Sequence, residues 1–409
     1  MVESLPPAIV FGGDINGLGI IRNLGREGVP VYCVLESADP AIYSKYCRGY
    51  YVLPDFLHRP DSVRSFLSRL ARRSPNRPVV FSTDDRTTLI LSSLKDEMKN
   101  EYTFMVPDKR VAETLVEKDR FYESLDEKGI DHPQVIHQSD GGDIRRIGKE
   151  LGYQVFIRPT VTQDFSEAFE HRKGFVANSE AELLDQFARV RARNIKVLFQ
   201  ELIPGPASNI YGIAGYFDHN SRALALFGYH RLRGWPPIIG LNTLIESVPL
   251  SQLRPQADLV ASYLHSIGYY GIMEAEFKLD PRDGRYKLLE INARSWFQNS
   301  FPTRCGLNII LKAYFDALGR GTSYSEDYRA GVKWVNFLQD IAASVGEGEI
   351  MKASWIHSLM GVEDHAFFDL HDPTPALVST LLEVGGFGQN QARLKPDVIR
   401  KVLQARGRN

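Results

Sequence analysis

Two alternating segments joined by a short turn constrain the fold of this chain more than any other feature. Residues 270–280 and 286–294 alternate polar and apolar side chains, as expected for two strands that each bury one face. Pro281, Asp283 and Gly284 supply the turn between them. Folding the chain symmetrically about the turn predicts three facing pairs: Asp280 with Tyr286, Glu276 with Glu290, and Glu274 with Asn292.

One face of this predicted hairpin is acidic and the other is apolar. The polar face carries Glu274, Glu276, Glu290, Asn292 and Arg294. The face predicted to enter a core carries Met273, Ala275, Phe277, Leu289 and Ile291. Opposed carboxylates repel each other, and Mg²⁺ takes oxygen ligands from a few carboxylates plus substrate phosphates. The spacing therefore favours a metal site, although an acidic face that only contacts water has the same pattern.

The composition is that of an ordinary globular protein with more than one domain. A length of 409 residues exceeds what one core usually spans. With 49 basic and 50 acidic residues, the net charge of −1 gives no support for a nucleic-acid or membrane-surface partner. The three cysteines lack disulfide or zinc spacing, and no apolar run approaches the length of a bilayer crossing. We therefore expect a soluble, cytoplasmic protein without a membrane partner.

The N-terminal segment predicts a βαβ unit. A short apolar strand at 8–11 runs into the glycine-rich segment 12–19, then a helix and a second strand at 29–35. The glycines do not match G-x-G-x-x-G, so geometry explains them better than a dinucleotide does. A further strand over 79–84 carries Ser82, Thr83 and Asp84 at its C-terminal end, where open α/β sheets usually hold ligands. These residues either contact a ligand or, as we favour, Thr83 or Asp84 caps the following helix.

A smaller unit is predicted beyond residue 108. An amphipathic helix over 111–128 carries Lys118 near its middle, where a lysine is usually exposed. Next come a strand that ends at Arg158, a polar segment over 160–175 suited to a lid, and a strand over 196–201. A buried strand ending in a carboxylate can offer backbone groups and one acceptor to a flat polar ring such as adenine.

Taken in order, these segments resemble the ATP-grasp superfamily, most closely its carboxylate–amine ligase branch, which includes D-aspartate ligases and carbamoyl-phosphate-synthase-like proteins. The resemblance covers about residues 8–318 and is strongest at the hairpin. It implies an α/β and α+β fold class, with a Rossmann-like N-terminal domain followed by the two-lobed ATP-grasp fold. The implied domains are a Rossmann-like domain at 1–107, a small lobe with its lid at 108–205, a large lobe with the metal site at 206–325, and a C-terminal extension at 326–409.

The same resemblance assigns the residues of the metal and transfer site. Glu276, Glu290 and Asn292 match the metal ligands, with Glu290 between two Mg²⁺ ions. Arg294 matches a residue that faces the transferred phosphoryl group. Arg233 matches a basic strand beside the phosphates and the acceptor, so both arginines are candidate catalytic residues.

The nucleotide-binding residues follow from the same resemblance. Lys118 and Arg158 match residues that reach the ATP phosphates, and Glu201 and Ile203 match the strand beside adenine. Two departures stand out. Arg158 occupies a position where the family usually has lysine, which is not equivalent in geometry. The lid contains only one glycine, so Arg172 or Lys173 would have to cover the phosphates.

These assignments imply an ATP-dependent ligase that joins a carboxylate to an amine through an acyl phosphate and releases ADP and phosphate. ATP and Mg²⁺ are the expected cofactors, and small-molecule carboxylates and amines are the expected partners. Mn²⁺ in place of Mg²⁺ and a homodimer remain open. Two alternatives also remain open: a catalytically weak nucleotide-binding or regulatory protein on the same fold, and a nicotinamide-dependent oxidoreductase that uses residues 12–19. The histidines show no H-x-x-x-H run, so zinc catalysis lacks support.

Overall fold

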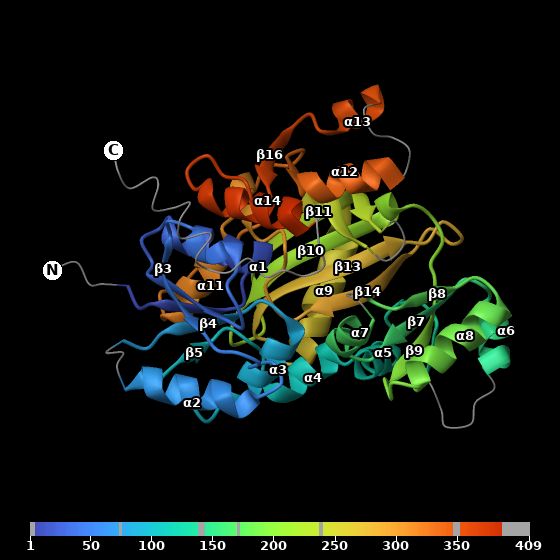
Figure 1. Ribbon diagram of the computed structural model, residues 1–409, viewed down its shortest axis with the longest axis horizontal. Coiled ribbons are helices and arrows are strands. Elements are labelled where there is room, and N and C mark those ends of the chain that lie inside the picture. The colour runs from blue at the N-terminus through green and yellow to red at the C-terminus, as the bar shows by residue number, and fades with distance from the viewer. Residues whose placement is uncertain are drawn as a thin grey trace.

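Three β-sheets organise the protein. The computed structural model describes residues 5–72, 76–137, 144–169, 172–236, 240–346 and 352–386. In Figure 1 a five-stranded sheet lies at the left, a four-stranded sheet at the lower right, and a seven-stranded sheet runs through the centre. The parallel N-terminal sheet and the mixed central sheet confirm the predicted α/β and α+β fold class.

The N-terminal sheet is parallel throughout, in the order β3-β2-β1-β4-β5. Its strands are β1 (Ala8–Phe11), β2 (Val31–Leu35), β3 (Cys47–Val52), β4 (Val79–Ser82) and β5 (Thr103–Phe104). Helices α1 (Asp14–Gly25), α2 (Pro60–Ala71) and α3 (Asp85–Leu94) belong to this unit. The ends of β1 and β4 meet, because Thr83 Oγ1 donates to the Phe11 carbonyl at 2.9 Å. Asp84 caps α3, as predicted, by accepting from the Thr87 backbone N–H at 2.8 Å.

The small unit holds a sheet in the order β6-β9-β7-β8. Its strands are β6 (Val135–His137), β7 (Val155–Pro159), β8 (Phe175–Ala177) and β9 (Val197–Glu201). Helices α6 (Ile144–Leu151), α7 (Thr162–Ala168) and α8 (Glu180–Arg191) cover it. The predicted lid segment contains α7 and an aromatic cluster, because the rings of Phe165, Phe169 and Phe175 lie 4.5–5.0 Å apart. Much of this segment is therefore packed structure rather than a loose polar loop; residues 170–171 of it lie outside the described part.

The single helix predicted over 111–128 is wrong. Two helices, α4 (Lys109–Val116) and α5 (Lys118–Glu127), meet at Glu117, whose backbone is extended with φ −78° and ψ 111°. The break makes Lys118 the first residue of α5 and lets its backbone N–H donate to the Thr160 carbonyl at 3.0 Å. Lys118 is consequently buried, with 4% exposure, where a mid-helix lysine would be expected in water.

The central sheet has the order β14-β13-β10-β11-β12-β15-β16. Its strands are β10 (Ile210–Phe217), β11 (Ala223–Trp235), β12 (Leu241–Val248), β13 (Gly271–Leu279), β14 (Tyr286–Asn292), β15 (Lys333–Val335) and β16 (Val362–His365). Its flanking helices are α9 (Arg254–Ser266), α10 (Ser300–Cys305), α11 (Ile309–Ala317), α12 (Phe337–Gly346), α13 (Ala353–Ser358) and α14 (Thr374–Gly386). Residues from the predicted C-terminal extension thus add β15 and β16 to the central sheet.

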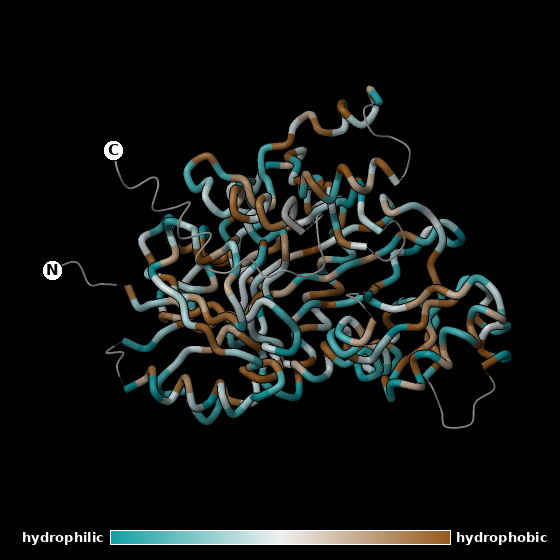
Figure 2. The backbone as a smooth tube through the Cα atoms, in the orientation of Figure 1, coloured by the Kyte–Doolittle hydropathy of each residue, from teal (hydrophilic) through white to brown (hydrophobic). Residues whose placement is uncertain are grey.

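Apolar residues gather along the strands and on the inner sides of the helices (Figure 2), where they form the buried clusters that hold the sheets to their helices. One cluster joins the N-terminal sheet to the central sheet. A buried hydrogen-bond network reinforces this junction, since Asn16 Nδ2 donates to the carbonyls of Thr83 and Ser295 at 2.8 and 2.9 Å. Within the described ranges, no helix combines the length and the apolar character needed to span a membrane.

The predicted hairpin is formed by β13 and β14. Glu276 lies opposite Glu290, and Glu274 lies opposite Asn292, which confirms two of the three predicted pairs. The pairing places all four polar side chains near one end of the hairpin. The two strands occupy the edge of the central sheet, next to β10.

The third predicted pair is wrong because the register shifts by one residue within the hairpin. Tyr286 lies opposite Leu279 rather than Asp280. A shift of this kind inserts one extra residue in one strand and re-aims its side chains. Simple alternation of side chains predicts that Leu289 enters the core. The structure places Leu288 there instead, fully buried. Leu289 instead lines the pocket next to the carboxylates.

Candidate nucleotide and metal site

A pocket between the small unit and the central sheet brings most of the predicted site residues together. Its walls come from the start of α5, the strands β7 and β9, and the strands β11, β13 and β14. Eight of the nine candidate residues line it: Lys118, Arg158, Glu201, Ile203, Glu276, Glu290, Asn292 and Arg294. Arg233 is the exception.

The opposed carboxylates of the hairpin each contact a cation from a different element. Glu290 lies 2.5 Å from Arg158 Nη2 and 3.4 Å from Lys118 Nζ. Arg231 Nη2 approaches Glu276 at 2.9 Å. Burial raises the pKa of Glu290, but the charges of Lys118 and Arg158 outweigh burial and hold it well below the usual range. In this state the cations, and not water alone, offset the repulsion between the two carboxylates.

Lys118 and Arg158 are both buried side chains in the wall of the pocket. Burial lowers the pKa of Lys118, and Glu290 opposes that effect. Arg158 also donates from Nη1 to the Tyr122 hydroxyl and to Gln200 Oε1, each at 3.1 Å. These contacts fix the planar guanidinium of Arg158 through several hydrogen bonds.

Glu274 orients the amide of Asn292. The Tyr229 hydroxyl donates to Glu274, and Asn292 Nδ2 donates to the same carboxylate at 2.8 Å. With its nitrogen engaged on Glu274, Asn292 turns its Oδ1 to Arg294 Nη2, at 3.1 Å. Burial, with a further contribution from Glu276, raises the pKa of Glu274 to about 7. Glu274 therefore orients the predicted metal ligand Asn292 by accepting from its amide nitrogen, which leaves the amide oxygen to face the pocket.

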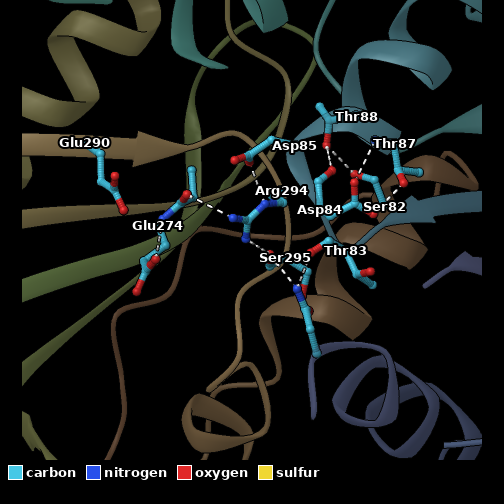
Figure 3. Close-up of polar contacts among 12 residues, drawn as sticks. Ser82, Thr83, Asp84, Asp85, Thr87, Thr88, Glu274, Glu290, Arg294 and Ser295 are labelled. Carbon is cyan, nitrogen blue, oxygen red and sulfur yellow. Dashed lines mark hydrogen bonds and ion pairs between the residues drawn. The ribbon is translucent and has the colours of Figure 1, made fainter. Parts of the chain in front are cut away.

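Arg294 connects the hairpin to the N-terminal unit. Figure 3 shows it between Asp85 and the carboxylates of Glu274 and Glu290. Its Nε donates to Asp85 Oδ1 at 2.7 Å, and its Nη1 donates to the Ser295 carbonyl at 3.0 Å. The sequence analysis did not identify Asp85 as a partner of Arg294. The available signal was the place of Asp85 just beyond the end of a parallel strand, where such sheets hold ligands.

Arg231, and not Arg233, lies beside the carboxylates. Arg233 donates from Nε and Nη2 to the two oxygens of Asp340, both at 2.8 Å, and Asp340 is fully buried. In a regular strand, residues two apart face the same side. The pairing of β11 with β12 shifts register between Arg231 and Arg233. The two side chains diverge as a result, which corrects the prediction that Arg233 contacts the acceptor.

The predicted adenine strand forms one wall of the pocket. Ile203 is buried at 4% exposure, and Leu289 and Phe156 add apolar surface. The Glu201 carboxylate accepts from the Gln134 backbone N–H at 3.1 Å and lies 2.5 Å from Arg282 Nη1. The wall thus offers an apolar slot edged by one carboxylate and by strand backbone.

Lys173 is the basic lid residue that reaches the pocket. It lines the pocket beside the carboxylates, and its charge contributes to the lowered pKa of Glu290. Arg172 instead lies over the ring of Phe175, 5.8 Å from its centroid. Of the two residues suggested by sequence, only Lys173 is positioned near a phosphate that would bind there.

The donor set suits Mg²⁺ bound together with a polyphosphate. Among the described residues, no group of three His, Cys, Asp or Glu side chains is arranged to hold a metal alone. Two facing carboxylates and the Asn292 oxygen nevertheless share one pocket with six basic residues, Lys118, Arg158, Lys173, Arg231, Lys278 and Arg294. Mg²⁺ is commonly held by one or two carboxylates plus substrate phosphates. The fit therefore depends on a phosphate ligand that draws the cations away from the carboxylates.

The lid helix is tied to the N-terminal unit through Arg86, the neighbour of Asp85. Arg86 Nη2 lies 2.6 Å from Asp164 and Nη1 lies 2.6 Å from Glu167, both on α7. Partly exposed pairs are each worth up to about 1 kcal/mol, so Arg86→Ala should favour opening of α7 roughly fivefold. Hydrogen exchange of residues 162–168 should speed up correspondingly, and the KM for ATP should rise.

A matched control for this variant is Arg64→Ala, which removes ion pairs to Asp61 and Glu97 inside the N-terminal unit. It should leave exchange in α7 unchanged. Equal exchange in wild type and Arg86→Ala would show that these pairs do not hold the lid.

Comparison with known proteins agrees with this fold. No protein-family model matches the chain. The chain is 26% identical over 315 residues to D-aspartate ligase of Enterococcus faecium (strain Aus0004), with 74% of each protein covered. Among solved structures, N5-carboxyaminoimidazole synthetase from Staphylococcus aureus matches with a TM-score of 0.65 and 13% identity, over 85% of this chain and 88% of that chain.

A second solved structure extends the likeness to a nucleotide complex. The biotin carboxylase domain of Hydrogenobacter thermophilus 2-oxoglutarate carboxylase, crystallised with MgADP and bicarbonate, matches with a TM-score of 0.64 and 17% identity. The match covers 80% of this chain and 73% of that domain. The chain therefore resembles a D-aspartate ligase in sequence and shares its fold with the N5-carboxyaminoimidazole synthetase and the biotin carboxylase domain.

Proposed function

We propose that the protein joins a carboxylate to an amine through an acyl phosphate and releases ADP and phosphate. The observation that carries this proposal is the convergence of Glu276, Glu290 and Asn292 with cations from three other elements in one pocket. The relative named D-aspartate ligase and the MgADP complex of a structural neighbour support ATP and Mg²⁺ as cofactors. A homodimer remains a proposal, supported by the neighbour that was solved as a dimer.

The residues of the pocket match the charge changes of this reaction. An oxygen of the substrate carboxylate attacks the γ-phosphorus, the bond to the β–γ bridging oxygen breaks, and ADP leaves. The amine nitrogen then attacks the acyl carbon, phosphate departs with the electron pair of the C–O bond, and the nitrogen loses its extra proton to phosphate and water. Mg²⁺, when bound, would neutralise the β and γ oxygens. Lys118, Arg158 and Arg294 would stabilise the remaining charge on the transferred group.

Ligand binding would exchange partners within the pocket. Lys118 and Arg158 both pair with Glu290. Phosphate oxygens would take over these cations, which frees the Glu290 carboxylate to face a metal ion. This exchange requires little movement, because all three side chains already line the same pocket.

The glycine-rich segment behind β1 has a packing explanation. A Cβ at Gly12 would lie 1.8 Å from Thr83 Oγ1, and one at Gly13 would lie 2.4 Å from the Asp39 carboxyl carbon. Close packing therefore explains both glycines, and the φ of +112° at Gly12 adds a conformation that favours glycine. This favours the ligase over the oxidoreductase alternative, whereas the catalytically weak alternative is separated from it by measuring turnover.

The test is to incubate the protein with MgATP, a pool of small carboxylic acids and hydroxylamine in place of the amine. We expect ADP and phosphate in equal amounts, together with a hydroxamate from trapping of the acyl phosphate. AMP and pyrophosphate would overturn the proposed mechanism. A stable phosphorylated product without hydroxamate would indicate a kinase, and absence of any turnover would favour a regulatory nucleotide-binding protein.

A further inference from the structure

Two of the three cysteines lie side by side on neighbouring strands of the N-terminal sheet. Cys33 is in β2 and Cys47 is the first residue of β3, and their Sγ atoms are 3.9 Å apart. Both are free thiols. No disulfide spacing is visible in the sequence, because only the pairing of β2 with β3 brings the two residues together. A disulfide would need the two sulfurs to approach by about 2 Å.

The two thiols differ in exposure. Cys33 is fully buried in the apolar core of the sheet. Cys47 is only partly buried, because β3 is the edge strand of its sheet among the described residues. A small oxidant in solution therefore reaches Cys47 directly and Cys33 only through it.

The two thiols also differ in acidity. The hydrogen bond with Cys33 lowers the pKa of Cys47, although burial opposes this effect. The same contact, together with burial, raises the pKa of the Cys33 thiol well above its usual range. The thiolate is the form of cysteine that reacts with oxidants. Cys47 is therefore the sulfur that reacts first, and Cys33 stays a thiol beside it.

The start of β3 also anchors the C-terminal part of the chain. The Cys47 backbone N–H donates to the Ser44 carbonyl at 3.0 Å. The Ser44 hydroxyl and the Lys45 backbone N–H donate to the two carboxylate oxygens of Asp372, at 2.7 and 2.9 Å. Asp372 is buried and also accepts from Arg22 Nε at 2.9 Å. Because Asp372 lies just before α14, the position of β3 affects how α14 is held.

The two cysteines are not directly opposite each other in the sheet. Val31 lies opposite Cys47 and Tyr50 lies opposite Cys33, with a register shift between these pairs. A disulfide tolerates Cα separations only up to about 7 Å, and residues on a diagonal are farther apart than directly opposite ones. A bond between the sulfurs would therefore draw the start of β3 towards Cys33 and disturb the hydrogen bonds at Asp372.

We propose that Cys33 and Cys47 form a redox switch, in which a hydroperoxide converts the two thiols to a disulfide and so loosens the anchor of α14 at Asp372. This modification site goes beyond the proposed function, and neither cysteine lines the nucleotide pocket. Strained disulfides are reduced more readily than relaxed ones, so a small thiol restores the pair.

Hydrogen peroxide supplies the two-electron oxidation. The Cys47 thiolate attacks one peroxide oxygen, the O–O bond breaks, and the departing hydroxide takes up a proton to become water. The Cys33 sulfur then attacks the sulfur of the resulting sulfenic acid. The S–O bond breaks, and the hydroxyl leaves with the Cys33 proton as a second water. The two thiols thus lose two electrons and two protons, and one peroxide gains them.

The first test treats the full, reduced chain with hydrogen peroxide and then alkylates the remaining thiols after denaturation. Peptide mass spectrometry should find Cys33 joined to Cys47 and should find Cys305 alkylated, since burial raises the pKa of Cys305 to about 12. Cys47→Ser should form no bridge, whereas the matched control Cys305→Ala should form it as wild type does. In Cys33→Ala, Cys47 should stop at the sulfenic acid, which dimedone traps.

Hydrogen exchange of α14 measures the effect on the anchor. In the oxidised wild type, exchange in residues 374–386 should be about fivefold faster than in the reduced protein, the scale of losing one hydrogen bond. The change should disappear with dithiothreitol and be absent from peroxide-treated Cys47→Ser. Ser44→Ala, which removes one donor to Asp372, should speed exchange of the same amides in the reduced chain.

Any of three results would overturn the switch: full alkylation of Cys33 and Cys47 after peroxide, a bridge that joins Cys47 to another chain, or a bridge within the chain that leaves α14 exchange unchanged. None of these measurements requires a nucleotide. Their outcome is therefore independent of the proposed ligase function.

Discussion

The Glu290→Gln variant is expected to lose turnover by at least about a hundredfold, the usual cost of removing one electrostatic stabiliser from an active site. The substitution keeps the shape of the side chain but removes the charge that faces Glu276 and, in the proposed complex, the metal. It should also lower stability in the absence of ligand. Arg158 and Lys118, both buried, lose their counter-charge on Glu290, which costs on the order of 1–3 kcal/mol because a glutamine oxygen still accepts one hydrogen bond.

Three measurements check this result: ADP release, melting temperature, and the melting shift given by ATP with Mg²⁺ or with EDTA. Wild type should be stabilised by MgATP and much less by ATP with EDTA. Asp283→Asn is the matched control, since Asp283 lies in the turn of the same hairpin and pairs with Lys287. It should keep wild-type turnover. Normal turnover in Glu290→Gln would show that the metal site lies elsewhere.

The second large effect is expected from Lys118→Met. Replacing the ammonium with an apolar side chain of similar length should lower kcat/KM for MgATP at least about a hundredfold, because a buried cation beside the transferred phosphate is lost. The free energy of unfolding should change less in Lys118→Met than in Glu290→Gln. Glu290 keeps Arg158 as its partner, and the cost of burying the ammonium disappears, so the free energy of unfolding should stay within about 1 kcal/mol of wild type.

Lys109→Met is the control for this variant. Lys109 lies on the preceding helix, α4, and its exposed side chain pairs with Glu113 one turn away. Substituting it should change neither the kinetics nor the melting temperature measurably. Unaltered kcat/KM in Lys118→Met would mean that the buried lysine serves packing alone, and a large loss of stability would mean that Glu290 depends on both cations.

Much of the fold could be predicted because local patterns were sufficient. Strict alternation in 270–280 and 286–294 predicted the hairpin and the pairs Glu276–Glu290 and Glu274–Asn292, both confirmed by the register. The helix cap at Asp84 followed from its place directly before a helix, and the structure confirms it. The hairpin pairs and the helix cap depend on residues that are close in sequence or joined by one turn. Tertiary packing therefore has little influence on them.

Two of the errors occur where a register shift between strands changed the direction of the side chains that follow. The register shift within the hairpin replaced Leu289 by Leu288 in the core and sent Leu289 into the pocket. A similar shift in β11 separated Arg231 from Arg233 and placed Arg231 on Glu276. Bulges depend on how two strands pack together. A single sequence does not predict them reliably, because the residues around a bulge show the same alternation of polar and apolar side chains in either register.

The sequence by itself determined the order of the units, the acidic hairpin and the type of residue available at the site. Only the tertiary structure decided which charged residues meet at that hairpin, because Lys118, Arg158, Arg231 and Asp85 come from four elements far apart in the chain. It also decided that Lys118 is buried, through the break between α4 and α5. The physical reason is that charge pairing acts through space, over a few ångströms, whereas sequence patterns report only the faces of single helices and strands.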